Sequence, residues 1–178
     1  MKTTATKSTR TAPDVGDMRP FRIKNILVPI DFSDCSKKAL QYALPLAKEY
    51  QAAITLVYVV SQTYPSALAP AYGSIEYTAI DYTQLTQNLK ESGAKELEKL
   101  AELEVSGEIA AKTVVRVGAP AEEIVETARS LQADIIVIST HGRTGLKHVL
   151  LGSVAEHVVQ RAPCPVLVVR EREHEILA

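Results

Sequence analysis

The sequence predicts an α/β protein in three layers, with helices on both faces of a five-stranded parallel sheet. Two observations carry this prediction. Five apolar runs of strand length alternate with segments whose apolar residues recur at helical spacing. Each right-handed crossover through a helix returns the next strand parallel to the last, so the helices cover both faces.

The first half of the chain supplies two strands and two helices. Residues 24–30 (KNILVPI) are expected to form the first strand, and Ser33 is placed to cap a helix. Pro45 is expected to kink that helix. The second strand covers 53–60, and a long connection from Ser61 to Ile80 leads to a helix over 82–103.

The second half continues the alternation without a repeat or a second domain. We expect strands at 110–117, 134–139 and 166–170, and helices at 121–130 and 152–161. The predicted domain covers 23–171, between a disordered N-terminal tail (1–22) and a C-terminal tail (172–178).

Composition excludes several classes of protein. A net charge of −1 without a basic stripe gives no reason to expect a nucleic-acid surface, and the apolar runs are too short to span a membrane. Two scattered cysteines form neither a metal cluster nor a disulfide framework, so a reducing compartment, the cytoplasm, is the simpler interpretation. We expect no metal bound by the protein alone.

The segment from Ile135 to Arg161 has the pattern of an anion site. A buried strand turns polar at Ser139, and Gly142 follows three residues later. Gly152 and Ser153 then directly precede a helical pattern. Glycine backbone, a hydroxyl and the unpaired N–H groups of a helix N-terminus are how proteins commonly hold a phosphate.

Three segments together resemble the universal stress protein family: 26–33 (ILVPIDFS), 118–124 (GAPAEEI), and 140–142 with 152–153 and 163–169. The resemblance covers residues 23 to 171. It implies a Rossmann-like, doubly wound sheet of order 3-2-1-4-5. In the nucleotide-binding branch of the family it also implies an ATP site with the pattern Gly-x2-Gly-x9-Gly-Ser/Thr. That strand order opens a crevice between strands one and four, where Asp31 and Ser139 are expected.

The resemblance also implies the residues of the nucleotide site. Pro29, Asp31 and Val59 would line the adenosine end, with Asp31 accepting a hydrogen bond from the ligand. The ribose and phosphates would be surrounded by Ile138, Ser139, Gly142, Gly152, Ser153, Val154 and Ala155. Arg143 and Lys147 either approach the γ-phosphate or are solvated. The cofactor would be ATP, with or without Mg or Mn.

Ser139 is a departure from the family pattern, because it stands where the first glycine is expected. Its hydroxymethyl group would either crowd the ligand or donate a hydrogen bond to it, and a positive φ at this position would strain it. His141 is a weaker candidate for a general base, since no carboxylate partner is evident in the sequence.

The function that follows is an ATP-binding stress-response or signalling module, at most a slow ATPase. The sequence has neither a Gly-x4-Gly-Lys-Ser/Thr loop nor a Gly-x-Gly-x-x-Gly after its first strand, so neither a P-loop NTPase nor a dinucleotide dehydrogenase is supported. Two alternatives stay open: a nucleotide-free family member acting through its dimer surface, and an adenylyl-transfer enzyme. The expected homodimer pairs Val166, Leu167, Val168 and Val169 at the sheet edge, because a bare apolar edge strand invites pairing.

Overall fold

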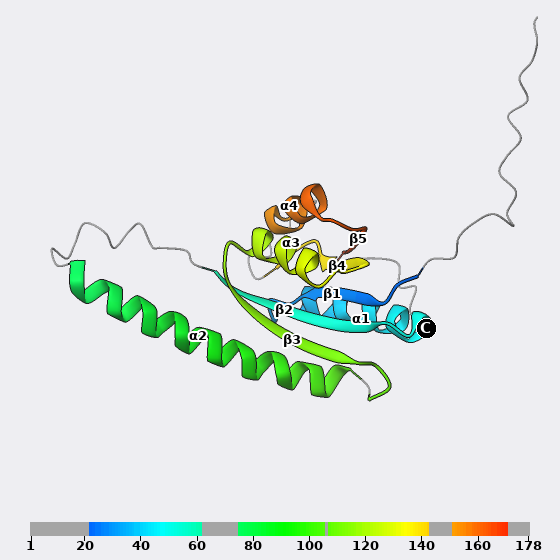
Figure 1. Ribbon diagram of the computed structural model, residues 1–178, viewed down its shortest axis with the longest axis horizontal. Helices are drawn as coiled ribbons and strands as arrows, with labels where there is room; N and C mark the ends of the chain where they lie inside the picture. The colour runs from blue at the N-terminus through cyan, green and yellow to red at the C-terminus, as the bar shows by residue number, and fades with distance from the viewer. Residues whose placement is uncertain (1–21, 62–74, 106, 143–150, 171–178) are drawn as a thin grey trace, which may run out of the picture.

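In a computed structural model of the protein, the described residues are 22–61, 75–105, 107–142 and 151–170, with the backbone alone for 75–82. Five strands form one parallel sheet in the order β3-β2-β1-β4-β5, which confirms the predicted fold (Figure 1). The strands are β1 (Asn25–Pro29), β2 (Ala53–Ser61), β3 (Ala111–Gly118), β4 (Ile135–Ser139) and β5 (Val166–Val169).

Helices cover both faces of this sheet and divide its core in two. They are α1 (Asp34–Tyr50), α2 (Ile75–Glu104), α3 (Pro120–Ser130) and α4 (Ser153–Arg161). Buried residues of α1 and α2 pack on one face, and those of α3 and α4 pack on the other. Figure 1 shows α3 and α4 together on one side of the sheet, with α2 on the opposite side.

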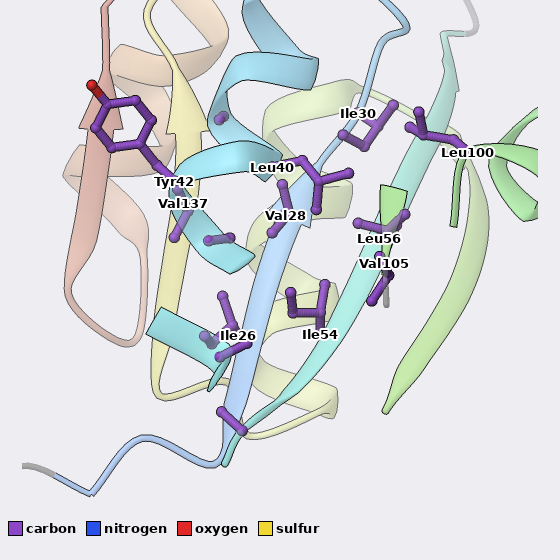
Figure 2. Close-up of a cluster of buried hydrophobic side chains, with 14 of the residues drawn as sticks. Ile26, Val28, Ile30, Leu40, Tyr42, Ile54, Leu56, Leu100, Val105 and Val137 are labelled. Atoms are coloured by element: carbon purple, nitrogen blue, oxygen red, sulfur yellow. The ribbon is translucent and has the colours of Figure 1, made fainter. Parts of the chain in front are cut away.

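The central strand β1 is buried on both faces, as its continuous apolar run predicts. Ile26 and Val28 point to the face of α1, where Leu40 joins them (Figure 2). Leu27 points to the opposite face and packs in the cluster with Val158 of α4. All of these side chains are at most 1% exposed, so β1 is fixed from both sides.

Local signals set the bounds of α1. Ser33 caps the helix as predicted, since its Oγ accepts a hydrogen bond from the backbone N–H of Ser36 at 3.2 Å. The helix continues through Pro45 to Tyr50, and its end is marked by a left-handed Gln51 with φ of 53°.

The second helix is longer than the sequence suggested. It begins at Ile75 rather than near residue 82, because residues 75–92 hold neither Gly nor Pro to interrupt it. Leu97 packs fully buried against the sheet, whereas Leu85 and Leu89 are 53% and 45% exposed. Figure 1 shows that this part of α2 extends past the end of the sheet.

A carboxylate joins β1 to β4 at their amino ends. Oδ2 of Asp134 accepts hydrogen bonds from the backbone N–H groups of Lys24 at 2.7 Å and Asn25 at 2.9 Å. This contact helps fix the register of β1 and β4.

The expected tails fall almost wholly on residues 1–21 and 171–178, outside the described residues. Within the described part of the chain, no helix combines the length and apolar character needed to cross a membrane.

Candidate functional site

A pocket of about 380 Å³ lies at the carboxyl edge of the sheet. The sheet reverses its direction of winding here, since β1 pairs with β2 on one side and with β4 on the other. The loops that leave β1 and β4 therefore diverge to opposite faces and open a crevice between them. The pocket lies where a doubly wound sheet is expected to bind a ligand.

All ten residues expected at a nucleotide site line this one pocket. They come from the end of β1, from β2, from the end of β4 and from the first turn of α4: Pro29, Asp31, Val59, Ile138, Ser139, Gly142, Gly152, Ser153, Val154 and Ala155. Arg143 and Lys147 fall outside the described residues.

Nine further residues line the pocket that the site prediction did not include. They are Ile30, Ser36, Val57, Tyr58, Ser61, Pro120, Ile124, Thr140 and His141. Pro120 and Ile124 belong to the family motif at 118–124, but their place at the pocket follows from the crossover from β3, which brings the start of α3 to this edge.

The Asp31 carboxylate is held by the turn that follows β1. Its Oδ1 accepts two hydrogen bonds from Ser33, one from Oγ at 2.5 Å and one from the backbone N–H at 3.1 Å. The backbone N–H of Asp31 donates to Oγ of the buried Ser36 at 3.4 Å, and that hydroxyl donates to the Ser33 carbonyl at 2.9 Å. Asp31 is thus anchored to the first turn of α1 by both its side chain and its backbone.

Phe32 gives this turn its shape. Its φ of 67° lies in the left-handed region, which costs a bulky residue roughly 1 kcal/mol or more. Its ring packs against Tyr58 of β2 with centroids 4.9 Å apart and planes at 48°. Such an aromatic pair contributes about 1 kcal/mol beyond burial, so it offsets much of the strain.

Ser139 has an unstrained backbone, and its hydroxyl bonds to the neighbouring loop. Among the described residues, positive φ outside glycine occurs at Phe32, Gln51 and Gln132, so Ser139 has an ordinary backbone conformation. Its side chain is nearly buried, and Oγ donates to the His141 carbonyl at 2.9 Å. The serine therefore uses its hydroxyl to shape the loop after β4.

The same loop holds the His141 ring. Its Nδ1 lies 2.9 Å from Oγ1 of Thr140, a buried residue. This contact orients the imidazole at the pocket wall.

The first turn of α4 opens into the pocket from the opposite side. Gly152 caps the helix without a side chain, and its own N–H donates to the Thr140 carbonyl at 2.8 Å. No cap side chain accepts a hydrogen bond from the following N–H groups, which belong to Ser153, Val154 and Ala155. These donors and the positive end of the helix dipole favour an anion here.

A metal ion would have little protein to bind at this site. Within the described ranges, no group of three or more His, Cys, Asp or Glu side chains is arranged to hold one. Among the described residues that line the pocket, Asp31 is the one with a carboxylate. A divalent cation there would need phosphate oxygens and water for most of its ligands.

Comparison with known proteins identifies the family. The family model described as the universal stress protein family matches residues 22–170. This chain is a universal stress protein. A curated relative, universal stress protein MJ0531 of Methanocaldococcus jannaschii, is 41% identical over 152 residues, 85% of each chain. The resemblance stated from sequence motifs is confirmed.

Solved universal stress proteins share the fold of this one. The structure of MJ0577, also from M. jannaschii, superposes with a TM-score of 0.73 at 32% identity, covering 86% of this chain and all of that one. A universal stress protein in complex with cAMP gives a TM-score of 0.58 at 23% identity, over 85% of this chain and all of that one. At that identity the second likeness shows the common fold alone.

Proposed function

We propose that this universal stress protein binds ATP in the pocket between β1 and β4 and acts as a nucleotide-dependent stress-response or signalling module. One observation carries the proposal. The first turn of α4, whose N–H groups donate to no cap side chain, and the anchored carboxylate of Asp31 line the same cavity of about 380 Å³. An anion site and an acceptor for hydroxyl or amino groups are what a nucleotide requires at its two ends.

The phosphates would lie against α4. The N–H groups of Ser153, Val154 and Ala155 would donate to phosphate oxygens, together with the Ser153 hydroxyl. Gly152 contributes space, because a β-carbon at this position would lie 2.8 Å from the Thr140 carbonyl oxygen. Its own N–H already has that acceptor, so Gly152 supports the turn and its N–H does not donate to the phosphates.

The nucleoside would lie against β1 and β2. Pro29, Val59 and Ile138 supply apolar wall, which suits the faces of a purine. Asp31 would accept a hydrogen bond from a ribose hydroxyl or from the adenine amino group.

Binding with slow turnover fits this site better than fast hydrolysis. Rapid phosphoryl transfer needs positioned metal carboxylates and a residue that orients the attacking water. The described residues offer no carboxylate cluster for Mg or Mn, so any metal would be held chiefly by the phosphates. We therefore propose that the bound nucleotide stabilises one conformation of the protein for as long as it stays bound.

The test is to identify and then titrate the nucleotide. Mass spectrometry of the denatured protein should release ATP or ADP, and calorimetry of the emptied protein should show ATP binding. Gly152→Ala should weaken that binding by about tenfold or more, since α4 must shift away from Thr140. The matched control is Gly107→Ala, where an added β-carbon meets nothing within 4 Å. The absence of both released nucleotide and binding heat would reject the proposal.

A second function, the dimeric interaction module, is favoured by the exposed edge of β5. This strand pairs with β4 alone within the described sheet, and Leu167 is 37% exposed. We propose that β5 pairs antiparallel with β5 of a second copy, so that the same strand meets itself across a two-fold axis. The dimer is compatible with nucleotide binding, because the pocket and the free edge of β5 are separate. A cytoplasmic setting stays a prediction, in keeping with Cys35 and Cys164 not being joined by a disulfide.

A further inference from the structure

Ser33 makes more hydrogen bonds than a helix cap requires. A cap needs only to accept from the first turn of its helix, and Ser33 Oγ does so with the N–H of Ser36 at 3.2 Å. The same hydroxyl donates to Oδ1 of Asp31 at 2.5 Å, and the Ser33 N–H adds a second bond to that oxygen at 3.1 Å. Ser33 thus joins the pocket carboxylate to the rigid start of α1.

These bonds decide which oxygen of Asp31 lies where. With Oδ1 fixed toward Ser33, the plane of the carboxylate is set and Oδ2 lies against Gly142 of the β4–α4 loop. Asp31 and Gly142 both line the pocket. A residue that does not line the pocket therefore helps set the orientation of the carboxylate in it.

The surrounding turn keeps Ser33 in place. Phe32 adopts its left-handed conformation between the two partners, and Ser36, which is 2% exposed, bonds to both ends of the turn. A carboxylate held this way loses little freedom when a ligand arrives, and pre-organisation of this kind raises affinity.

We propose that Ser33 is a positioning residue for nucleotide binding, acting through Asp31. The inference rests on the proposed function, because it assumes that Asp31 accepts a hydrogen bond from the nucleotide. Removal of the Ser33 hydroxyl takes away the shorter of the two bonds that Ser33 makes to Oδ1, so the carboxylate gains freedom that the ligand must remove on binding. The loss corresponds to about one hydrogen bond, or roughly fivefold in Kd.

The experiment separates positioning from capping. Ser33→Gly is the informative variant, because glycine is nearly as good a helix cap as serine but has no hydroxyl to donate to Asp31. Its thermal midpoint should stay close to that of the wild type, while its Kd for ATP rises about fivefold. Ser33→Thr keeps the hydroxyl and should bind within about twofold of the wild type.

A double-mutant cycle then asks whether the effect passes through Asp31. In the Asp31→Ala background, Ser33→Gly should leave the Kd for ATP unchanged, since the carboxylate that Ser33 orients has been removed. An equal loss in both backgrounds would assign Ser33 a structural role alone and overturn the inference. If Asp31→Ala binds too weakly to measure, equal binding by Ser33→Thr and Ser33→Gly overturns it instead. A wild-type protein that binds no ATP would reject the proposed function itself, and the role of Ser33 with it.

Discussion

Gly142 lies directly against the Asp31 carboxylate, so closely that a β-carbon at position 142 would overlap Oδ2. The two residues belong to loops that leave β1 and β4 on either side of the switch in winding direction. Among the described glycines, positive φ occurs at Gly118, so Gly142 is not required for a left-handed backbone. It is required because a side chain would not fit against Asp31. This contact brings the two walls of the pocket together.

Gly142→Ala should therefore push the Asp31 carboxylate or the β4–α4 loop out of place. We expect ATP affinity to fall by about tenfold, because displacement of a ligand contact by about 1 Å is costly at such a site. Calorimetric titration measures the change, with Gly107→Ala as the control for a glycine without neighbours within 4 Å. Unchanged affinity in Gly142→Ala would show that the ligand does not depend on this contact.

Ser139→Gly restores the family pattern and should have little effect on binding. The Ser139 hydroxyl already donates to the His141 carbonyl, so we expect it neither to donate to the ligand nor to crowd it. We expect the Kd for ATP to stay within about threefold of the wild type, since at most one hydrogen bond within the loop is lost. A large gain in affinity would instead mean that the hydroxymethyl group obstructs the pocket.

Leu167→Lys should convert the proposed dimer to a monomer. Leu167 is chosen over its neighbours because the side chains of Val166 and Val168 pack against the core beside α3 and α4. Val168→Lys would therefore disturb the fold as well as the edge. Leu167 is partly exposed, and a charge there should block strand pairing at little cost to the subunit. Sedimentation velocity measures the shift in mass. Leu103→Lys, at a leucine that is 72% exposed on α2, is the control, and an undiminished dimer in Leu167→Lys would reject this interface.

Cys164 should react slowly until the solution is strongly alkaline. Burial, with a smaller contribution from the charge of Asp134, raises the pKa of the Cys164 thiol above its ordinary value of 9.0. At a pH between the two pKa values, the folded protein therefore keeps the thiol proton that the unfolded chain has lost. The resulting stabilisation is present below pH 9.0 and disappears as the pH rises through the folded pKa.

The alkylation rate of a Cys35→Ser protein as a function of pH checks this expectation for Cys164. The rate should reach half its maximum at a higher pH in the native protein than in the same protein in urea, because only the thiolate reacts. Coincident pH profiles would contradict it.

The pattern of the sequence determined the strands and their parallel direction, and the family resemblance supplied the strand order and ten of the residues that line the pocket. Apolar runs such as 26–28 and 135–138 are dictated by burial on both faces, and the cap at Ser33 is a local signal. The family motifs placed Asp31, Gly142 and Gly152 at one edge, because the ends of parallel strands must meet there. The strands and the cap depend on periodicity and on short-range chemistry, which a single sequence displays, whereas the placement of the site residues depends on the family motifs.

Tertiary structure alone decided how those residues meet. The role of Ser139 follows from its bond to His141, and that of Gly142 follows from the proximity of Asp31, neither of which has a sequence signal. The arrival of Pro120 and Ile124 at the pocket depends on where the crossover from β3 returns. Contacts between distant segments are set by the packing of the whole sheet, so the residues of the site could be predicted while their hydrogen bonds could not.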